Sequence, residues 1–473
     1  MDWVPHTRQI AAEYLDRPQR DDRIYIADAE TGDTRLIFED TDSKTYVDTI
    51  GFHGLDVDFT WLPSQGKPDA APAALLWFSE RDGWRHAYAI PLSATPAQPK
   101  LLTDFAADII DPVALDPVGG WLFFTASPGD PIRSYLYRVS LTASATPTRL
   151  TPSGETGTHA FSSAAPDGLY AIESFSNANT APRFTLTRLA DSHPVRTLAE
   201  SPAITAKVVA LDTPIEFTAS AIGNGVSLST LLIKPPHFDP TKKYPVLTYI
   251  YGEPADQTVV DRFSSLYTTL CFIAREGYIV LSFDNQGTPA PRGRDWRHAG
   301  YGAIGVLSTQ QQAEAIHSFA ASHPFIDTSR MAMWGWSGGG TNTLNMMFRN
   351  PGLYSTGISI APVADQKRYD TIYQERYMGV PSTNARGYQQ GSAINFAQGL
   401  TGNLLIIHGS GDDNVHMAGT EVLVNRLITL GKTFDFMDYP GRTHSISEGE
   451  GTYLNVIMRT VRYLEDHVPA GAR

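Results

Sequence analysis

Residues 331–340, MAMWGWSGGG, contain the strongest local signal for the fold of this chain. A short apolar run leads into a serine flanked by glycines, and apolar residues with helical spacing follow at Leu344, Met347 and Phe348. A strand, a sharp turn and a helix in this order form the setting that the Gly-x-Ser-x-Gly motif of a nucleophilic serine requires. Because an ordinary Gly/Ser loop can carry the same letters, the interpretation depends on partners for Ser337 elsewhere in the sequence.

Two glycines of this stretch have a steric role. Such a turn brings strand and helix close together, so side chains at Gly335 and Gly339 would collide with their neighbours. The turn also holds the serine backbone under strain. The serine hydroxyl is then left exposed at the end of a sheet.

The chain from about residue 206 to residue 473 alternates strands with helices. Apolar runs of strand length lie at 246–251, 278–283, 331–334, 357–360 and 404–407, and helical patterns lie at 309–321, 419–430 and 452–464. Compact apolar runs are typical of a buried parallel sheet. Their alternation with helices predicts an α/β domain with a mostly parallel sheet and helices on both faces.

An open parallel sheet carries its functional residues at the carboxyl ends of its strands. Asp412 follows the run 404–407, and His444 follows a further strand-like run at 434–437. The chain order Ser, Asp, His is that of α/β-hydrolases. A serine needs a neutral histidine to take its proton, and that histidine needs a carboxylate to fix its tautomer. We therefore predict a catalytic triad of Ser337, Asp412 and His444.

Each partner of the serine has competitors. Asp413 could replace Asp412, which could also serve only to cap the following helix. His408 and His416 compete with His444, but His408 belongs to the strand end and His416 lies close to the acid in sequence. A metal site built from Asp412, Asp413 and His416 has no supporting ligand spacing, so we expect neither a metal nor a cofactor.

The oxyanion that forms during acyl transfer needs hydrogen-bond donors. The backbone N–H of Gly338 is one donor by construction of the turn, and the second is expected from the loop after an early strand. Tyr251 follows the run 246–250 and could offer its hydroxyl. A tyrosine at a strand end is, however, more often only packing.

The first two hundred residues contain short strands separated by turns. Four hairpin-like pairs recur, at 23–27 with 34–38, 86–90 with 100–102, 135–139 with 149–151, and 184–187 with 195–198. The steps from Tyr88 to Tyr137 and from Tyr137 to Leu186 are both 49 residues. A repeat of this length with four strands per unit is typical of a β-propeller. We predict a partial propeller of three to four blades over residues 1–205, with an open β-sandwich as the alternative.

The composition limits the partners of the chain. A formal net charge of −13 argues against nucleic acid and anionic membranes. Cys271 is the only cysteine, which excludes an intrachain disulfide and a multi-cysteine metal site and suggests a small buried apolar residue. No window approaches 18 apolar residues, and the first residues lack the pattern of a signal peptide. We expect a cytoplasmic location on that basis, or a periplasmic one if the natural N-terminus lies upstream.

Several motifs together resemble the dipeptidyl peptidase IV branch of the prolyl oligopeptidase family of serine peptidases. They are GWSxGG at 335–340, YDTIYQERYMG at 369–379, DDNVH at 412–416, and His444, which lies 32 residues after Asp412. The segments SERDGWRH at 79–86 and FTASP at 124–128 resemble the later propeller blades of that branch. The resemblance therefore covers essentially the whole chain.

The resemblance implies an enzyme that releases N-terminal X-Pro, or less well X-Ala, dipeptides from peptide substrates through an acyl-enzyme. Ser337 would be the nucleophile, His444 the general base and then acid, and Tyr251 an oxyanion donor. Asn414 would hold the carbonyl of the penultimate substrate residue. The proline pocket would be formed by Val363, Tyr369, Tyr373 and Val415. A homodimer through the hydrolase domain is also implied by analogy.

The sequence departs from the pattern of this branch in three places. Gly338 stands where a tyrosine is common, which would widen the pocket, and Gln366 stands where a tryptophan is often found. No Asp-Trp-x-Tyr-Glu-Glu segment is present, although its paired glutamates bind the substrate ammonium in the family. The alternatives are therefore an acylaminoacyl-peptidase-like oligopeptidase or esterase of the same fold and, less favoured, a non-catalytic interaction protein.

Overall fold

The computed structural model describes residues 1–48, 59–64, 70–93 and 96–473, and their contacts separate two compact units. The first unit comprises residues 1–202, 260–262 and 290–295, and the second comprises residues 203–259, 263–289 and 296–473. The predicted domain boundary after residue 205 lies within helix α1 (Pro202–Val209) and stays a prediction.

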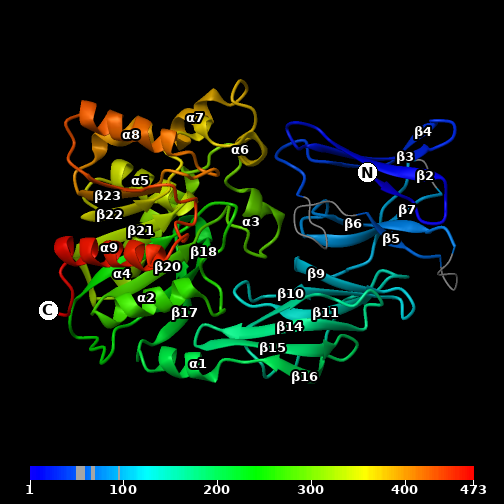
Figure 1. Cartoon of the computed structure of the whole chain (residues 1–473), viewed down its shortest axis with the longest axis horizontal. Helices are drawn as coiled ribbons and strands as arrows, with labels where there is room; N and C mark the ends of the chain where they lie inside the picture. The colour runs from blue at the N-terminus through cyan, green and yellow to red at the C-terminus, as the bar shows by residue number, and fades with distance from the viewer. Residues whose placement is uncertain (49–58, 65–69, 94–95) are drawn as a thin grey trace. The chain divides into compact units, whose positions relative to one another are not determined.

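The first unit contains four antiparallel sheets of four strands each (Figure 1). Each sheet pairs strands that follow one another in sequence, which is how the blades of a propeller are built. The four predicted hairpins are present as β3–β4, β7–β8, β11–β12 and β15–β16, so the partial propeller is confirmed. The strands are β1 (Asp2–Trp3), β2 (Gln9–Leu15), β3 (Asp21–Asp28), β4 (Thr34–Thr41), β5 (Thr60–Leu62), β6 (Ala74–Ser79), β7 (His86–Pro91), β8 (Lys100–Leu101), β9 (Ile109–Asp116), β10 (Trp121–Ala126), β11 (Tyr135–Ser140), β12 (Thr148–Arg149), β13 (Thr158–Ser162), β14 (Tyr170–Asn177), β15 (Thr180–Arg188) and β16 (His193–Ala199).

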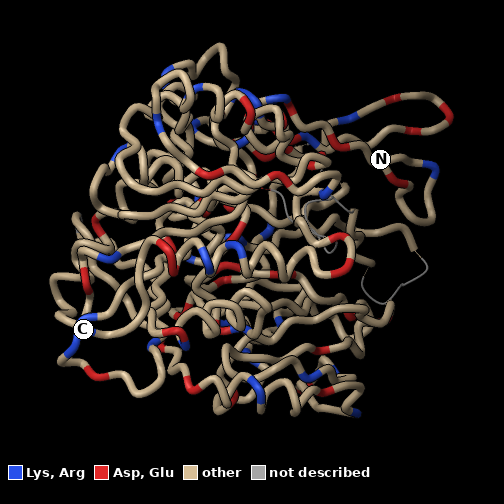
Figure 2. The backbone as a smooth tube through the Cα atoms, turned by 60° about the vertical axis from the view of Figure 1, so that its left-hand side comes forward, with Lys and Arg blue, Asp and Glu red and all other residues tan. Residues whose placement is uncertain are grey.

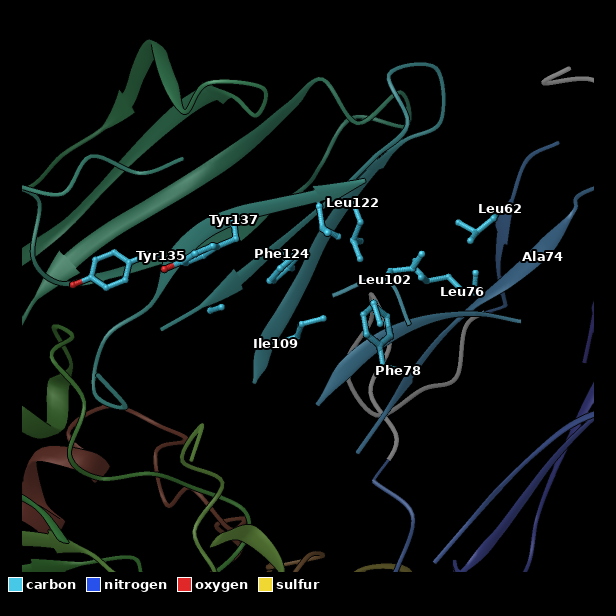
Figure 3. Packing of buried hydrophobic residues seen from close by; sticks show 14 residues of the cluster. Leu62, Ala74, Leu76, Phe78, Leu102, Ile109, Leu122, Phe124, Tyr135 and Tyr137 are labelled. Carbon is cyan, nitrogen blue, oxygen red and sulfur yellow. The ribbon is translucent and has the colours of Figure 1, made fainter. Parts of the chain in front are cut away.

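Neighbouring sheets of this unit share apolar cores (Figure 3). Leu76 and Phe78 from the β5–β8 sheet belong to the same buried cluster as Leu122 and Phe124 from the β9–β12 sheet. The ring of Phe124 also stacks on that of Tyr137, with centroids 6.1 Å apart. Each side chain of this size contributes about 1.5–3 kcal/mol when it is fully buried. The cluster shared by the two sheets holds one blade against the next, whereas the Phe124–Tyr137 stack lies within one blade.

The second unit is organised around one sheet of eight strands, with helices on both faces (Figure 1). Its strand order is β17-β18-β20-β19-β21-β22-β23-β24, and the strands from β20 to β24 are parallel. This confirms the α/β-hydrolase fold. The strands are β17 (Ile215–Ala221), β18 (Ser227–Ile233), β19 (Tyr244–Ile250), β20 (Ile279–Asp284), β21 (Ile326–Trp336), β22 (Thr356–Ile360), β23 (Asn403–Gly409) and β24 (Asp435–Tyr439).

The helices predicted at 309–321, 419–430 and 452–464 are present as α4, α8 and α9, and the helix predicted after Ser337 is present as α5. The main helices are α2 (Ser265–Arg275), α3 (Arg294–His298), α4 (Leu307–Ser322), α5 (Gly338–Arg349), α6 (Thr371–Met378), α7 (Ala385–Gly391), α8 (Met417–Thr429) and α9 (Thr452–His467). Helix α2 was not predicted; the Ser264 side chain caps it by accepting the Tyr267 N–H. Cys271 lies in this helix and is buried, as predicted.

Two further observations concern possible membrane and nucleic-acid partners. No helix among the described residues is long and apolar enough to cross a bilayer. Lys and Arg are interspersed with Asp and Glu along the backbone (Figure 2).

Candidate active site

Ser337 lies at the sharp turn between β21 and α5, where the sequence places it. Its backbone has φ 59° and ψ −120°, a region that side-chain-bearing residues rarely adopt. The Ser337 N–H donates to the carbonyl of Ile360 at 2.8 Å, and the Ser337 carbonyl accepts from the Thr341 N–H at 3.0 Å. Strain of this kind costs about 1–3 kcal/mol and persists only where neighbouring structure enforces it. The strained turn presents the hydroxyl at the carboxyl end of the sheet.

The glycines around the serine allow two backbones to touch, as predicted. A Cβ atom on Gly335 would lie 2.2 Å from the carbonyl oxygen of Gly339, and one on Gly339 would lie 2.1 Å from that of Ile250. The second contact brings the start of α5 against the end of β19. The Asn342 Nδ2 group joins the same segments, because it donates to the Tyr251 carbonyl at 2.8 Å and to the Gly338 carbonyl at 3.0 Å.

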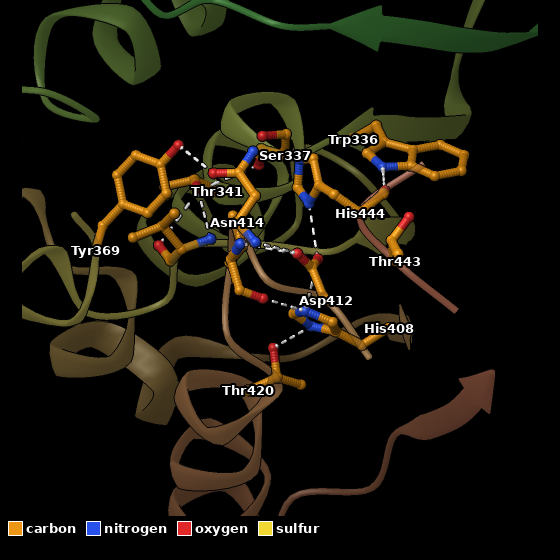
Figure 4. A network of polar contacts seen from close by, with 12 residues as sticks. Trp336, Ser337, Thr341, Tyr369, His408, Asp412, Asn414, Thr420, Thr443 and His444 are labelled. Carbon is orange, nitrogen blue, oxygen red and sulfur yellow. Dashed lines mark hydrogen bonds and ion pairs between the residues drawn. The ribbon is translucent and has the colours of Figure 1, made fainter. Parts of the chain in front are cut away.

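The predicted acid and imidazole meet behind the serine (Figure 4). Nδ1 of His444 lies 2.7 Å from Oδ2 of Asp412, which is 4% exposed, whereas Asp413 is exposed. Oδ1 of Asp412 accepts the backbone N–H groups of Asn414 and Val415 at 3.0 and 2.8 Å. Burial alone would raise the pKa of Asp412, but hydrogen bonds from the imidazoles and the Val415 N–H outweigh it and hold that pKa well below its usual range. The carboxylate therefore stays ionised beside His444.

A second histidine, which the sequence analysis had set aside, supports this carboxylate. His408 is fully buried, and its Nε2 lies 3.2 Å from Oδ2 of Asp412 and 2.8 Å from the Val415 carbonyl. Its Nδ1 contacts the Thr420 hydroxyl at 2.8 Å (Figure 4). The only sequence signal was its position four residues before Asp412 at a strand end. His408 thus holds the acid from the side opposite His444.

Ser337 and His444 line the same pocket and lie side by side (Figure 4). The serine hydroxyl lies in the same pocket lining as the side chain of Tyr251, and among the described residues it forms no hydrogen bond with the His444 imidazole. Catalytic hydrogen bonds are often long or misaligned without substrate. The indole N–H of Trp336 donates to the His444 carbonyl at 3.0 Å, which fixes the backbone of the histidine next to the serine turn.

Two donors surround the place where an oxyanion would form. The Gly338 N–H is at the first position of α5, where helix N–H groups have no intrahelical partner. Tyr251 follows β19 directly, and its side chain lines the pocket with Ser337. Burial and the nearby Glu253 carboxyl raise the pKa of Tyr251, although its hydrogen bond with Ser337 opposes this. The hydroxyl therefore remains protonated and able to donate.

The pocket beside the serine has a volume of about 430 Å³ and brings most of the predicted substrate residues together. The rings of Tyr369 and Tyr373 meet edge to face with centroids 5.5 Å apart, and Val363 lies in the same lining. The Tyr369 hydroxyl donates to Oδ1 of Asn414 at 2.8 Å, which leaves the amide N–H groups of Asn414 for another acceptor. Val415 is buried and is absent from the described lining of this pocket; its backbone contacts are with Asp412 and His408.

Two departures from the family pattern have structural consequences, and the one at Gly338 differs from the expected widening of the pocket. Gly338 does not simply widen the pocket, because a Cβ atom there would lie 2.7 Å from Oε2 of Glu253, whose side chain takes up that space. Gln366 is 2% exposed and accepts from Gln374 at 2.8 Å, so it belongs to a buried network. Glu253 was missed by the sequence analysis, since only its position two residues after Tyr251 pointed to the site.

Metal ligands are a separate question. Within the described ranges, no group of three or more His, Cys, Asp or Glu side chains is arranged to hold a metal ion. In the segment 412–416, Asp412 is buried against two imidazoles, whereas Asp413 and His416 are exposed.

Comparison with known proteins agrees with both units. Residues 1–182 match the dipeptidyl peptidase IV (DPP IV) N-terminal region, and residues 264–470 match the prolyl oligopeptidase family. A probable dipeptidyl-aminopeptidase B of Aspergillus clavatus is 34% identical over 392 residues, which are 81% of this chain and 42% of that protein. The dipeptidyl-aminopeptidase B of Aspergillus niger is 31% identical over 90% of this chain and 47% of its own length. The chain thus spans about half the length of these curated relatives.

Solved structures give the same result. The crystal structure of Porphyromonas gingivalis dipeptidyl peptidase 4 is 30% identical and superimposes with a TM-score of 0.84, covering 97% of this chain and 62% of that one. A putative dipeptidyl aminopeptidase IV from Bacteroides ovatus is 25% identical with a TM-score of 0.85, covering 98% and 66%. The chain belongs to the prolyl oligopeptidase family of serine peptidases, in its dipeptidyl peptidase IV branch.

Proposed function

We propose that the chain is a serine peptidase that releases N-terminal dipeptides with proline or alanine in the second position. The observation that carries this proposal is the 2.7 Å contact between His444 and Asp412 beside a strained Ser337 in one pocket. The names of the related proteins, which are dipeptidyl-aminopeptidases and dipeptidyl peptidases, support the dipeptide product.

The reaction would proceed through an acyl-enzyme. His444 takes the proton of the Ser337 hydroxyl as its oxygen attacks the scissile carbonyl carbon, and Asp412 stabilises the imidazolium. The Gly338 N–H and the Tyr251 hydroxyl donate to the oxyanion. The imidazolium then protonates the leaving amine as the C–N bond breaks. A water molecule, deprotonated by His444, hydrolyses the ester and restores Ser337.

The pocket residues have matching roles in this proposal. The two tyrosine rings and Val363 offer an apolar slot for the pyrrolidine ring of proline, which has no N–H to satisfy. The free amide N–H groups of Asn414 are available to the carbonyl of the penultimate residue. Tyr369 orients that amide through its hydrogen bond.

A second candidate is an acylaminoacyl-peptidase-like oligopeptidase or an esterase of the same fold. It is favoured by the absence of an Asp-Trp-x-Tyr-Glu-Glu segment from the printed sequence. Two carboxylates facing an ammonium group would stabilise it strongly in a water-poor site. A site without them would have less basis for preferring a free N-terminus.

Chromogenic substrates separate the candidates. Hydrolysis of Gly-Pro, N-acetyl-Ala and simple ester substrates is measured for the wild type and for Ser337→Ala. Gly-Pro turnover that is lost when the amino group is acetylated supports the dipeptidyl peptidase, whereas acetyl-Ala or ester turnover alone supports the second candidate. Unchanged rates for Ser337→Ala would overturn both.

A further inference from the structure

Glu253 is a buried carboxyl in the wall of the candidate substrate pocket, and the proposed reaction gives it no role. It lies in the loop after β19, lines the pocket with Ser337 and Gly338, and is 6% exposed. A Cβ atom on Gly338 would lie 2.7 Å from its Oε2 and 2.8 Å from its Cδ. The carboxyl therefore occupies the space that a side chain at position 338 would fill, directly beside the proposed oxyanion donor.

This carboxyl has unused hydrogen-bonding capacity. Its Oε1 and the hydroxyl of Tyr373 are both buried, and neither forms a well-aligned hydrogen bond within the described residues, although the two groups lie close enough for the tyrosine hydroxyl to act on the pKa of the carboxyl. Burial raises the pKa of Glu253 to about 8, against a smaller opposing effect of the Tyr373 hydroxyl. The group is therefore mainly protonated at neutral pH and can both donate and accept. A buried polar group without a partner is destabilising, so a ligand that satisfies it binds better for that reason.

We propose that Glu253 determines specificity by hydrogen bonding to a hydroxyl on a short side chain at the substrate position just before the scissile bond. This inference rests on the proposed peptidase chemistry at Ser337 and changes the substrate preference stated there, because it places serine and threonine ahead of proline and alanine. Serine and threonine at that position would satisfy the carboxyl, whereas alanine, valine and proline would leave it without a partner. A site built around such a bond discriminates more strongly than an apolar pocket does.

The position of the Glu253 carboxyl determines the length of the substrate side chain that can contact it. Because Glu253 lies beside Gly338, it is close to the carbonyl under attack, and a hydroxyl one bond beyond the substrate Cβ is the group that can reach it. The other polar groups around it are the hydroxyls of Tyr251, Tyr369 and Tyr373 and the carboxyl of Asp256, which lines the same pocket. A lysine side chain is longer, so its ammonium group would extend beyond the Glu253 carboxyl instead of contacting it.

The test uses isosteric substrate pairs. We would measure kcat/KM of the wild type for Gly-Ser against Gly-Ala and for Gly-Thr against Gly-Val anilides, with Gly-Pro and Gly-Lys alongside. We expect a preference of at least about tenfold for the hydroxylated member of each pair. Equal or higher values for Gly-Ala and Gly-Val, or a preference for Gly-Lys above all others, would overturn the proposal without any variant.

Variants then assign the effect to this side chain. Glu253→Leu is expected to lose the preference and to improve relative turnover of Gly-Pro, whereas Glu253→Gln, which keeps a donor and an acceptor, is expected to retain most of it. Asp256→Asn is the matched control in the same lining and should retain the preference. If thermal unfolding shows that Glu253→Leu does not fold, Glu253→Ala replaces it. A preference that survives in either apolar variant overturns the assignment.

The proposed function and the proposed role of Glu253 can be overturned independently of each other. If Ser337→Ala hydrolyses all of these anilides as fast as the wild type does, the serine mechanism itself is wrong. If activity depends on Ser337 but the two members of each pair are cleaved equally, only the role of Glu253 is wrong.

Discussion

Two buried carboxyl groups near the candidate site, Asp412 and Glu253, behave in opposite ways. Asp412 accepts two backbone N–H groups and lies beside two imidazoles, and its pKa is lowered in spite of burial. Glu253 is similarly buried, but its Oε1 forms no well-aligned hydrogen bond among the described residues, and burial raises its pKa to about 8. The supply of donors therefore decides which carboxyl carries a charge, because burial alone favours the neutral form of both.

The difference has a mechanistic meaning. The ionised carboxylate at Asp412 can stabilise an imidazolium without itself taking the proton. A charged group at Glu253 would instead lie beside the oxyanion donors and oppose the negative charge that develops there. The same kind of side chain is thus used as a charge in one loop and as a neutral group in the other.

Asp412→Asn removes the charge but keeps the shape of the acid. We expect kcat for Gly-Pro anilide to fall by about 10⁴ with little change in KM, because the Asn amide can donate to Nδ1 of His444 and so favour the wrong tautomer. Steady-state kinetics measure this. Asp413→Asn, which changes the exposed neighbouring residue, should leave kcat within about twofold, and an equal loss in both variants would contradict the assignment of the acid.

Tyr251→Phe tests the side-chain oxyanion donor, which lines the same pocket as the neutral carboxyl. Loss of an oxyanion donor is expected to lower kcat by roughly 10²–10³ while KM changes little, since the bond is strongest in the transition state. Tyr249→Phe, which alters another tyrosine of the pocket lining, is the control. A change confined to KM would instead indicate that Tyr251 only packs against the substrate.

The pH dependence of activity reports on Glu253 directly. Its pKa is raised to about 8, so the group is neutral at pH 7 and acquires a negative charge as the pH rises through that value. We expect kcat/KM of the wild type to fall by about tenfold on the alkaline side because this charge opposes the oxyanion. Glu253→Gln cannot ionise and should hold its activity to higher pH. Identical alkaline limbs in the two proteins would show that Glu253 does not titrate there.

The free energy of unfolding should also decrease as the pH rises through the pKa of Glu253. Since the folded-state pKa of Glu253 lies above its ordinary value of 4.5, the folded protein binds a proton more tightly than the unfolded chain does. The stabilisation is fully present below pH 4.5 and is lost as the pH rises through about 8. Urea unfolding at pH 5 and pH 9 should show a larger loss for the wild type than for Glu253→Gln. An equal loss in both would contradict a buried neutral carboxyl.

These contrasts also show what could be predicted from the sequence. Ser337, Asp412 and His444 could be proposed from the sequence because each is marked locally, by a glycine-flanked turn or by the end of an apolar strand. The parallel strands were found for the same reason, whereas β17 and β18 were missed because they mix polar with apolar residues and pair antiparallel at the sheet edge. The contact of Glu253 with Gly338 joins two distant segments, and neither segment alone predicts it. Long-range packing of this kind requires the structure.

The smallest expected effect tests that contact. Gly338→Ala places a methyl group where Glu253 now lies, so Oε2 must move, and because it ends a flexible side chain we expect a loss of only about 1 kcal/mol in the free energy of unfolding. Glu253→Ala removes the obstacle, so Gly338→Ala should cost much less in that background, and the double-mutant cycle should give a coupling of about 1 kcal/mol. Gly419→Ala is the control, since no atom lies within 4 Å of a Cβ there. Additive effects of the two substitutions would mean that the two residues do not share this space, and the specificity proposed for Glu253 would lose its geometric basis.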